Sequence, residues 1–198
     1  MRKSWVAIVV AVWGLSWSSS TRAEDASSFG GQGSASLAAE RLFGIHHAVP
    51  SSGSNITTFS LFGPGGLEAA AAPYSIPRLG FDYFAAGGFS LGLGAELTVV
   101  SPENGSNTTI LGLNPRLGYA LRLSDAVTFW PRAGVSYVLL DPAGTSSAYL
   151  LAATLEAQLV ITPVQHFGFV LGPTADIGLS ATHTKLTELG LQAGLIGW

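Results

Sequence analysis

The sequence predicts an all-β chain: a single up-and-down antiparallel transmembrane β-barrel of about eight strands, following a cleaved signal peptide. Three observations predict this class. Apolar residues alternate with small or polar ones over segments of ten or more residues. The links between these segments are short and long in turn. Charged residues make up only 11% of the 198 residues, under half of the ~25% found in soluble domains.

The N-terminus has the features of a secretory signal. Arg2 and Lys3 precede an apolar run over residues 5–15, and small residues then lead to Ala23, after which we expect cleavage. The apolar run is about half as long as the ~20 residues that a spanning helix needs. The expected organisation is a signal peptide over 1–23, a flexible Ser/Gly-rich leader over 24–35 and the barrel domain over 36–198.

Charge and cysteine content exclude several classes of function. Removal of residues 1–23 leaves six basic against twelve acidic residues, a balance that disfavours nucleic acid as a partner. The chain has no Cys, which excludes disulfides, thiolate metal sites and Cys nucleophiles. The sequence suggests no cofactor.

The strands are predicted from the alternation itself. In 89–99 the odd positions hold Phe, Leu, Leu, Ala, Leu and Val, and the even ones Ser, Gly, Gly, Glu and Thr. Segments of this length suit tilted membrane strands of ~9–11 residues better than soluble strands of ~5–6. An even number of strands places both termini on one side. The expected strands cover 37–47, 76–85, 89–99, 111–122, 127–139, 151–161, 167–179 and 186–198.

The links predict the orientation. Tight turns fall at 87–88, 124–125 and 163–165, with longer polar links at 48–75, 101–108, 141–148 and 181–185. Short turns face the periplasm in bacterial barrels, so the longer links lie outside. Long loops on a rigid scaffold usually carry recognition. We therefore expect loops 48–75 and 101–108 to meet an external partner, with a short helical turn over 67–72 above the mouth.

Aromatic residues gather beside the short turns, where an interfacial girdle is expected. The predicted girdle consists of Tyr83, Phe84, Phe89, Phe129, Phe167, Phe169 and Trp198.

Charged residues recur on the small, polar face of the strands. Arg on the lipid face would cost ~2–4 kcal/mol, so this face is expected to line the lumen. Hairpin symmetry predicts a lateral row of Glu96, Arg116, Arg132 and Glu156 across four neighbouring strands, extended towards the outer end by Asp176 with Gln192. In a lumen just wide enough for side chains, such a row is expected to form a plug, and the alternative is a narrow ion-conducting pore.

Strand count, alternating link lengths and the terminal aromatic Trp198 give the chain a resemblance, over its whole mature length, to the small outer-membrane β-barrels of the OmpA and OmpX type. The resemblance implies a Gram-negative cell envelope, contact with outer-membrane lipid, and assembly by the barrel assembly machinery through the strand that ends in Trp198. One departure is that Leu191 and Leu195 are out of phase with Trp198. Either a bulge at Gly197 restores the phase, or the assembly signal is imperfect.

The predicted role is a structural or surface-exposed envelope component without enzymatic activity. An exported soluble barrel of lipocalin type is an alternative, in which the apolar residues would face inward. A lipid-modifying barrel enzyme would need Ser180, His183 and Glu188 together, but no nucleophile motif accompanies them. His46, His47 and His183 are expected near the outer rim. Because His46 and His47 are adjacent in a strand and point to opposite faces, at most two of the three could bind one ion, so no metal is expected.

Overall fold

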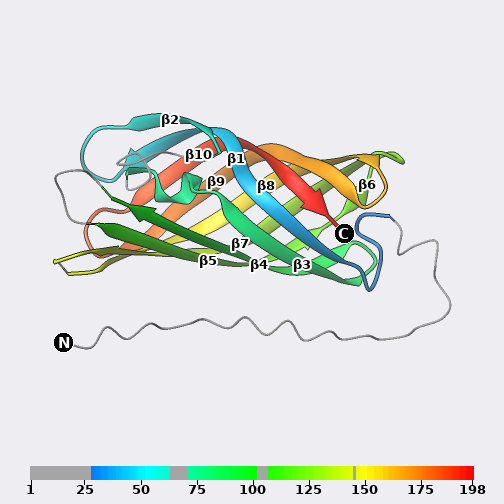
Figure 1. Cartoon of the computed structure of the whole chain (residues 1–198), viewed down its shortest axis with the longest axis horizontal. Coiled ribbons are helices and arrows are strands. Elements are labelled where there is room, and N and C mark those ends of the chain that lie inside the picture. The colour runs from blue at the N-terminus through cyan, green and yellow to red at the C-terminus, as the bar shows by residue number, and fades with distance from the viewer. Residues whose placement is uncertain (1–27, 63–70, 102–106, 145) are drawn as a thin grey trace.

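Figure 1 shows the computed structural model of the chain, which describes residues 28–62, 71–101, 107–144 and 146–198. The predicted signal peptide, the first residues of the leader, most of 67–72 and the centre of the 101–108 loop lie outside the described residues. The elements are β1 (Ala35–Pro50), β2 (Ile56–Leu61), the 3-10 helix η1 (Pro73–Ser75), β3 (Arg78–Ala86), β4 (Phe89–Val100), β5 (Thr108–Tyr119), β6 (Leu121–Arg122), β7 (Val127–Pro142), β8 (Ala148–Val164), β9 (Phe167–Ala181) and β10 (Leu186–Gly197).

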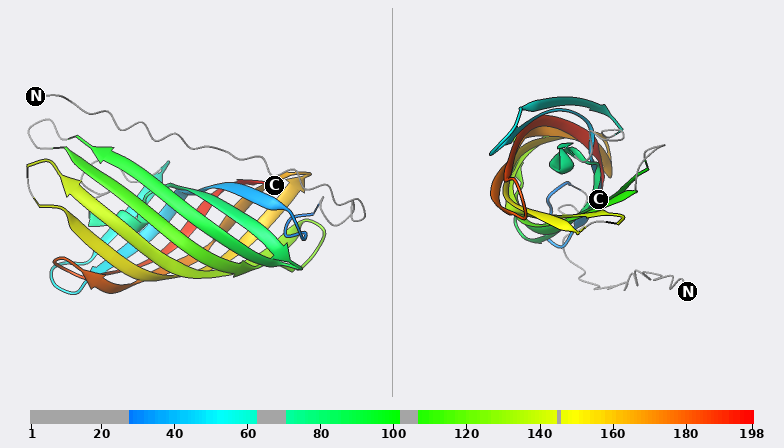
Figure 2. Two further views of the ribbon diagram at one scale, coloured as in Figure 1. Left: turned by 90° about the horizontal axis from the view of Figure 1, so that it is seen from below. Right: turned by 90° about the vertical axis from the view of Figure 1, so that its left-hand side faces the viewer.

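Eight of these strands close an antiparallel barrel in chain order. Each of β1, β3, β4, β5, β7, β8, β9 and β10 pairs with the next, and β10 returns to β1. The view along the axis in Figure 2 shows the closed ring, with η1 lying inside it. No helix in the described part of the chain is long and apolar enough to cross a membrane. The predicted fold class and strand number are confirmed.

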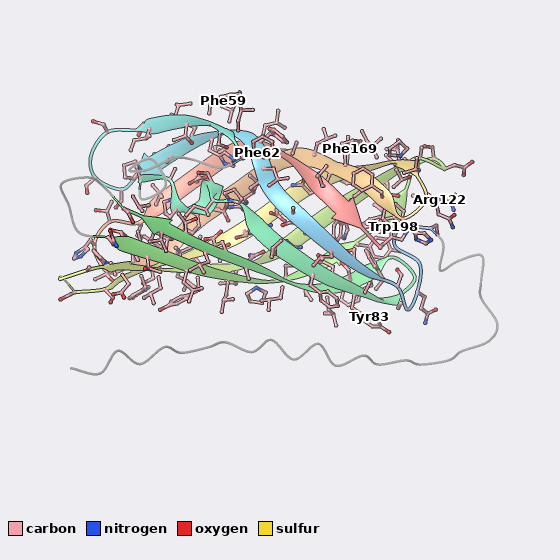
Figure 3. All side chains as sticks on the ribbon, viewed as in Figure 1. Phe59, Phe62, Tyr83, Arg122, Phe169 and Trp198 are labelled. Atoms are coloured by element: carbon pink, nitrogen blue, oxygen red, sulfur yellow. The ribbon has the colours of Figure 1, made fainter. Side chains whose placement is uncertain are left out.

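The burial pattern is the reverse of that in a soluble protein. Large apolar side chains are exposed on the outer wall, among them Leu97 at 68% and Phe59 at 66%, while charged side chains such as Arg116 and Glu156 are buried inside. Figure 3 shows Phe59, Tyr83 and Phe169 pointing away from the barrel. An apolar wall of this kind suits the hydrocarbon of a membrane. The closed barrel also leaves no strand edge whose backbone groups would lack hydrogen-bond partners there. It also excludes the lipocalin-type alternative, whose apolar residues would face inward.

Strand β1 is divided by a bulge. Ala39 pairs with Leu195, whereas the next paired residue, Phe43, faces Ala193, so that two extra residues are accommodated around Arg41, which has a φ of 58°. Below the bulge β1 pairs with β3, and above it β1 pairs with β2. The link predicted over 48–75 therefore contains a strand, and it ends in the 3-10 helix η1.

The end of the predicted leader is packed rather than flexible. Phe29 is 7% exposed, and β1 begins at Ala35. Gly33 donates a backbone hydrogen bond to the carbonyl of Phe84, and Phe84 donates one to Ser34. Glycines with positive φ at 30 and 33 permit the turns that bring this segment back over the barrel end. Figure 1 shows it beside the C-terminus, at the end with the short turns.

Candidate functional site

The lumen is the candidate site, and its centre is a buried ionic network around Glu40. The carboxylate of Glu40 accepts hydrogen bonds from Arg78 Nε at 2.6 Å, from Arg116 Nη1 at 2.7 Å and from Arg132 Nη1 at 2.5 Å. All four side chains are at most 2% exposed. Charge-assisted bonds of this kind are the strong ones in proteins, so Glu40 ties three strands together across the lumen.

Three further carboxylates complete this layer. Glu156 lies 2.8 Å from Arg132 Nη2 and also pairs with Arg78. Asp82 accepts from Arg116 Nε at 3.1 Å and from its Nη2 at 2.5 Å. Asp176 accepts from Arg41 Nη2 at 2.9 Å and from the Thr154 hydroxyl at 2.6 Å. Four guanidinium groups thus face four paired carboxylates, so the charges of this layer balance.

The structure places the five predicted network residues inside the lumen, but the predicted row is out of register. Glu96 faces Gly112, not Arg116, because the β4–β5 hairpin is centred earlier than assumed. Arg116 faces Gly134, not Arg132, since the turn after β6 closes through Leu123 and Val127. Only Arg132 and Glu156 face each other as expected.

The predicted extension of the row needs the same correction. Gln192 pairs with Gly172, whereas Asp176 pairs with Glu188, because β9 and β10 are offset by four positions from the predicted pairing. The side chain of Asp176 nevertheless reaches the ionic layer through Arg41.

Sequence reasoning missed the residues that organise the network: Glu40, Arg41, Arg78 and Asp82. Glu40 and Arg41 are adjacent yet both buried, an arrangement that strict alternation forbids and the β1 bulge allows. Arg78 and Asp82 occupy even positions of a predicted strand, as Glu96 does. Their place on the polar face of that strand was therefore a feature of the sequence from which both residues could have been predicted to face the lumen.

The remaining buried carboxylates lie outside this core. Glu188 Oε1 is 3.0 Å from His46 Nδ1, and both side chains are fully buried. Glu96 has no ion pair within 4.0 Å among the described residues. Of the residues considered for a hydrolase, Glu188 pairs with His46, and the Ser180 hydroxyl lies 3.1 Å from that of Tyr149. The described residues also contain no cluster of three metal-ligating side chains.

An apolar layer lies towards the outer end of the lumen. Tyr74 and Ile76, which flank or belong to η1, are 1% exposed and pack with Ile110, Val138 and Leu186 from the surrounding strands. A tyrosine hydroxyl is uncharged at neutral pH, so this layer contributes no charge.

A second apolar layer lies at the short-turn end and is built from rings. The Phe29 ring meets those of Phe84, Trp130 and Trp198 at centroid distances of 5.2, 5.1 and 5.5 Å, each edge to face. Phe84 and Trp130 are fully buried. Arg132 lies over Trp130 at 4.3 Å, which joins the ring layer to the ionic layer above it.

These contacts correct two members of the predicted girdle. Phe84 points into the lumen because its neighbour Tyr83 points out, and successive residues of a strand face opposite sides. Trp198 shares the inward phase of Ile196 and contacts Phe29, which accounts for its mismatch with the outward leucines of β10 without a bulge. The structure places the other members, Tyr83, Phe89, Phe129, Phe167 and Phe169, on the outer wall as exposed or half-buried rings.

An apolar outer wall, a charged interior and eight antiparallel strands, with both ends of the described chain at the short turns, define a small outer-membrane β-barrel protein. The protein lies in the bacterial outer membrane, in contact with its lipid.

A comparison with solved structures finds the same fold in Neisserial surface protein A. The chain is similar to Neisserial surface protein A, with 13% identity, a TM-score of 0.56, and coverage of 82% of this chain and 96% of that one. Ail, the attachment invasion locus protein of Yersinia pestis, is similar at 12% identity and a TM-score of 0.49, over 83% and 99% of the two chains. No protein-family model matches the chain, and no curated protein matches its sequence.

Proposed function

We propose that the protein is a surface-exposed envelope component without enzymatic activity, whose lumen is plugged by its own side chains. The observation that carries this proposal is the filling of the lumen by three layers in series: apolar residues around Tyr74, the ionic layer around Glu40 and the rings around Phe29. Eight strands leave room for little else, so no continuous water path is expected.

The charge balance supports a plug over a pore. A selective pore requires charged groups that face water and exchange it for an ion. Here the guanidinium groups of Arg78, Arg116 and Arg132 are committed to carboxylates and are at most 2% exposed. An ion entering the layer would have to break bonds that no water replaces.

The test is single-channel recording. The mature protein in a planar lipid bilayer is expected to give no stable current steps. A variant in which Arg132 and Glu156 are both replaced by Ala removes a facing pair together and opens the ionic layer without leaving a lone charge. It serves as the positive comparison. Large, stable currents from the unmodified protein would overturn the plug and favour the pore.

We further propose that the outer links form a contact surface for an external partner. β2 and η1 both belong to the long link between β1 and β3, and the β1–β2 hairpin lies at the end of the barrel opposite the two ends of the described chain. A rigid barrel that presents such loops is the arrangement by which recognition sites are commonly displayed. Exchange of residues 51–55, the β1–β2 turn, for a Gly/Ser linker should remove binding to target cells without changing barrel folding.

A further inference from the structure

The outer mouth of the barrel holds a hollow of about 590 Å³ that the plug does not occupy. Five strands, β1, β5, β7, β8 and β10, contribute to its lining together with the start of η1. Leu140 and Pro142 come from β7, Leu150 from β8, Leu186 from β10 and Pro73 from η1. Its floor is the apolar layer around Tyr74. We call this hollow the vestibule.

The vestibule is apolar although it opens to the outside. Leu186 and Pro73 are buried, but Leu140, Pro142 and Leu150 are only half-buried, so part of their apolar surface is left without the burial that stabilises apolar side chains. A concave, largely apolar hollow of ~300–1,000 Å³ with a few polar groups on one side is the usual form of a small-molecule site. An apolar body of matching size would bury these walls.

The link between β9 and β10 contributes two of the five polar residues that line the vestibule in the described part of the chain, and the other three are Thr108, Ser146 and Tyr149. His183 and Thr184 line it from this link, and the Thr184 hydroxyl lies 3.2 Å from that of Ser52. The next residue, Lys185, is exposed and is the only Lys in the chain after Lys3. Lys185 stands beside the lining and is not part of it. No carboxylate is among the described residues that line the hollow. This side therefore favours a negatively charged group over a positive one.

We propose that the vestibule binds a small amphipathic anion, a molecule with an aliphatic body and one carboxylate or phosphate end. The body would lie against Leu140, Leu150 and Leu186, and the anionic end would face the link that carries His183 and Lys185. The proposal goes beyond a surface-exposed, sealed barrel, because the site lies above the plug and requires no passage through it.

The chain has no Cys, so a single thiol can report occupancy. Leu150→Cys places one in the vestibule wall, and Ser54→Cys places a control in the exposed β1–β2 turn. Both variants are reconstituted in lipid nanodiscs and labelled with a membrane-impermeant maleimide, with decanoate, decyl phosphate, decyltrimethylammonium or butyrate present. At about four times its dissociation constant a ligand leaves about one fifth of the sites free, so labelling should slow about fivefold.

Decanoate, decyl phosphate or both should protect Leu150→Cys, and the comparison of these two identifies the preferred head group. Decyltrimethylammonium and butyrate should not protect, since the first has the wrong charge and the second lacks the apolar body. Protection that is equal for the cation, that occurs equally at Ser54→Cys, or that is absent with both anions overturns the proposal.

Two variants make the test independent of a single thiol. Ala148→Trp, added to Leu150→Cys, fills the vestibule and should abolish protection by either anion. The pair His183→Ala and Lys185→Ala should remove the discrimination between decanoate and decyltrimethylammonium. Retained protection in the first, or unchanged discrimination in the second, overturns the site. Heat-modifiable migration in gels verifies that each variant is folded. The protein should give no current in planar bilayers, with or without decanoate. This recording tests the plug independently of ligand binding in the vestibule.

Discussion

At the scale of single residues, the centre of this barrel depends on one carboxylate. Glu40 receives hydrogen bonds from three guanidinium groups that reach it from β3, β5 and β7. A buried ion pair contributes little when it replaces well-packed apolar residues, but removal of one partner leaves the other charge buried and uncompensated. Glu40 is therefore where a single substitution should be most harmful.

Glu40→Gln keeps the shape of the side chain and removes its charge, which leaves three Arg sharing the remaining carboxylates. We expect a loss of ~3–5 kcal/mol in unfolding free energy, measured by urea titration in lipid vesicles. Glu96→Gln is the matched control, because Glu96 is also a buried Glu but has no ion pair within 4.0 Å among the described residues. Equal losses in the two variants would show that Glu40 is not the organising group.

Glycine supplies the space through which these long side chains pass. A Cβ added at Gly80 would lie 2.5 Å from Arg116 Nη2 and 3.0 Å from Glu40 Oε1. Gly80→Ala should therefore push the guanidinium away from its carboxylate and cost ~1–3 kcal/mol, as overpacking generally does. Gly87→Ala, in a turn with nothing within 4 Å, should leave the stability unchanged. The two are compared in the same urea titration, and a neutral Gly80→Ala would contradict the packing.

At the scale of elements, the segment before β1 closes the barrel end from inside. Phe29 is held by three rings, and the backbone bonds between Gly33, Ser34 and Phe84 continue the barrel wall into this segment. Edge-to-face ring pairs contribute ~0.5–1.5 kcal/mol each beyond the area they bury. The segment is therefore a structural part of the lumen filling.

Phe29→Ala should lower the stability by ~3–5 kcal/mol, the usual cost of truncating a buried Phe. Tryptophan fluorescence gives a direct readout, since Trp130 and Trp198 are the only Trp residues after the predicted signal peptide and both contact Phe29. Their quenching by acrylamide should increase in the variant. Phe59→Ala on the outer wall, where Phe59 is 66% exposed, should leave quenching unchanged. Unchanged quenching in Phe29→Ala would mean that the segment does not cover these rings.

At the scale of the whole molecule, the distribution of links fixes the orientation in the membrane. Both ends of the described chain lie with the short turns, and the β1–β2 hairpin lies at the opposite end. In bacterial barrels the short turns are periplasmic. The vestibule and the β1–β2 hairpin then face the exterior, and Phe29 faces the periplasm.

A thiol label tests this orientation on intact cells. Ser54→Cys, in the β1–β2 turn, should react with an impermeant maleimide added outside, whereas Asp125→Cys, in an exposed short turn, should react only after the outer membrane is permeabilised. The reverse order of accessibility would invert the topology and place the vestibule in the periplasm.

The sequence by itself determined the barrel. The alternation over segments such as 89–99 determines which face of each strand meets lipid, because successive side chains of a strand point to opposite sides. Segment length and the alternation of links then determine a membrane strand and the up-and-down order. These are local properties, readable without knowledge of any partner strand.

Only the tertiary structure decided which charges meet. Register depends on the centre of each turn, and any change of that centre moves every facing pair. The β4–β5 turn is centred two positions earlier than predicted, which is why Glu96 faces Gly112 and not Arg116. The bulge that turns both Glu40 and Arg41 inward arises from β1 having to pair with β10, β2 and β3 at once. The contacts of Phe29 with Trp130 and Trp198 cross the lumen between segments remote in sequence. Such contacts exist only once the barrel has closed, so no local pattern encodes them.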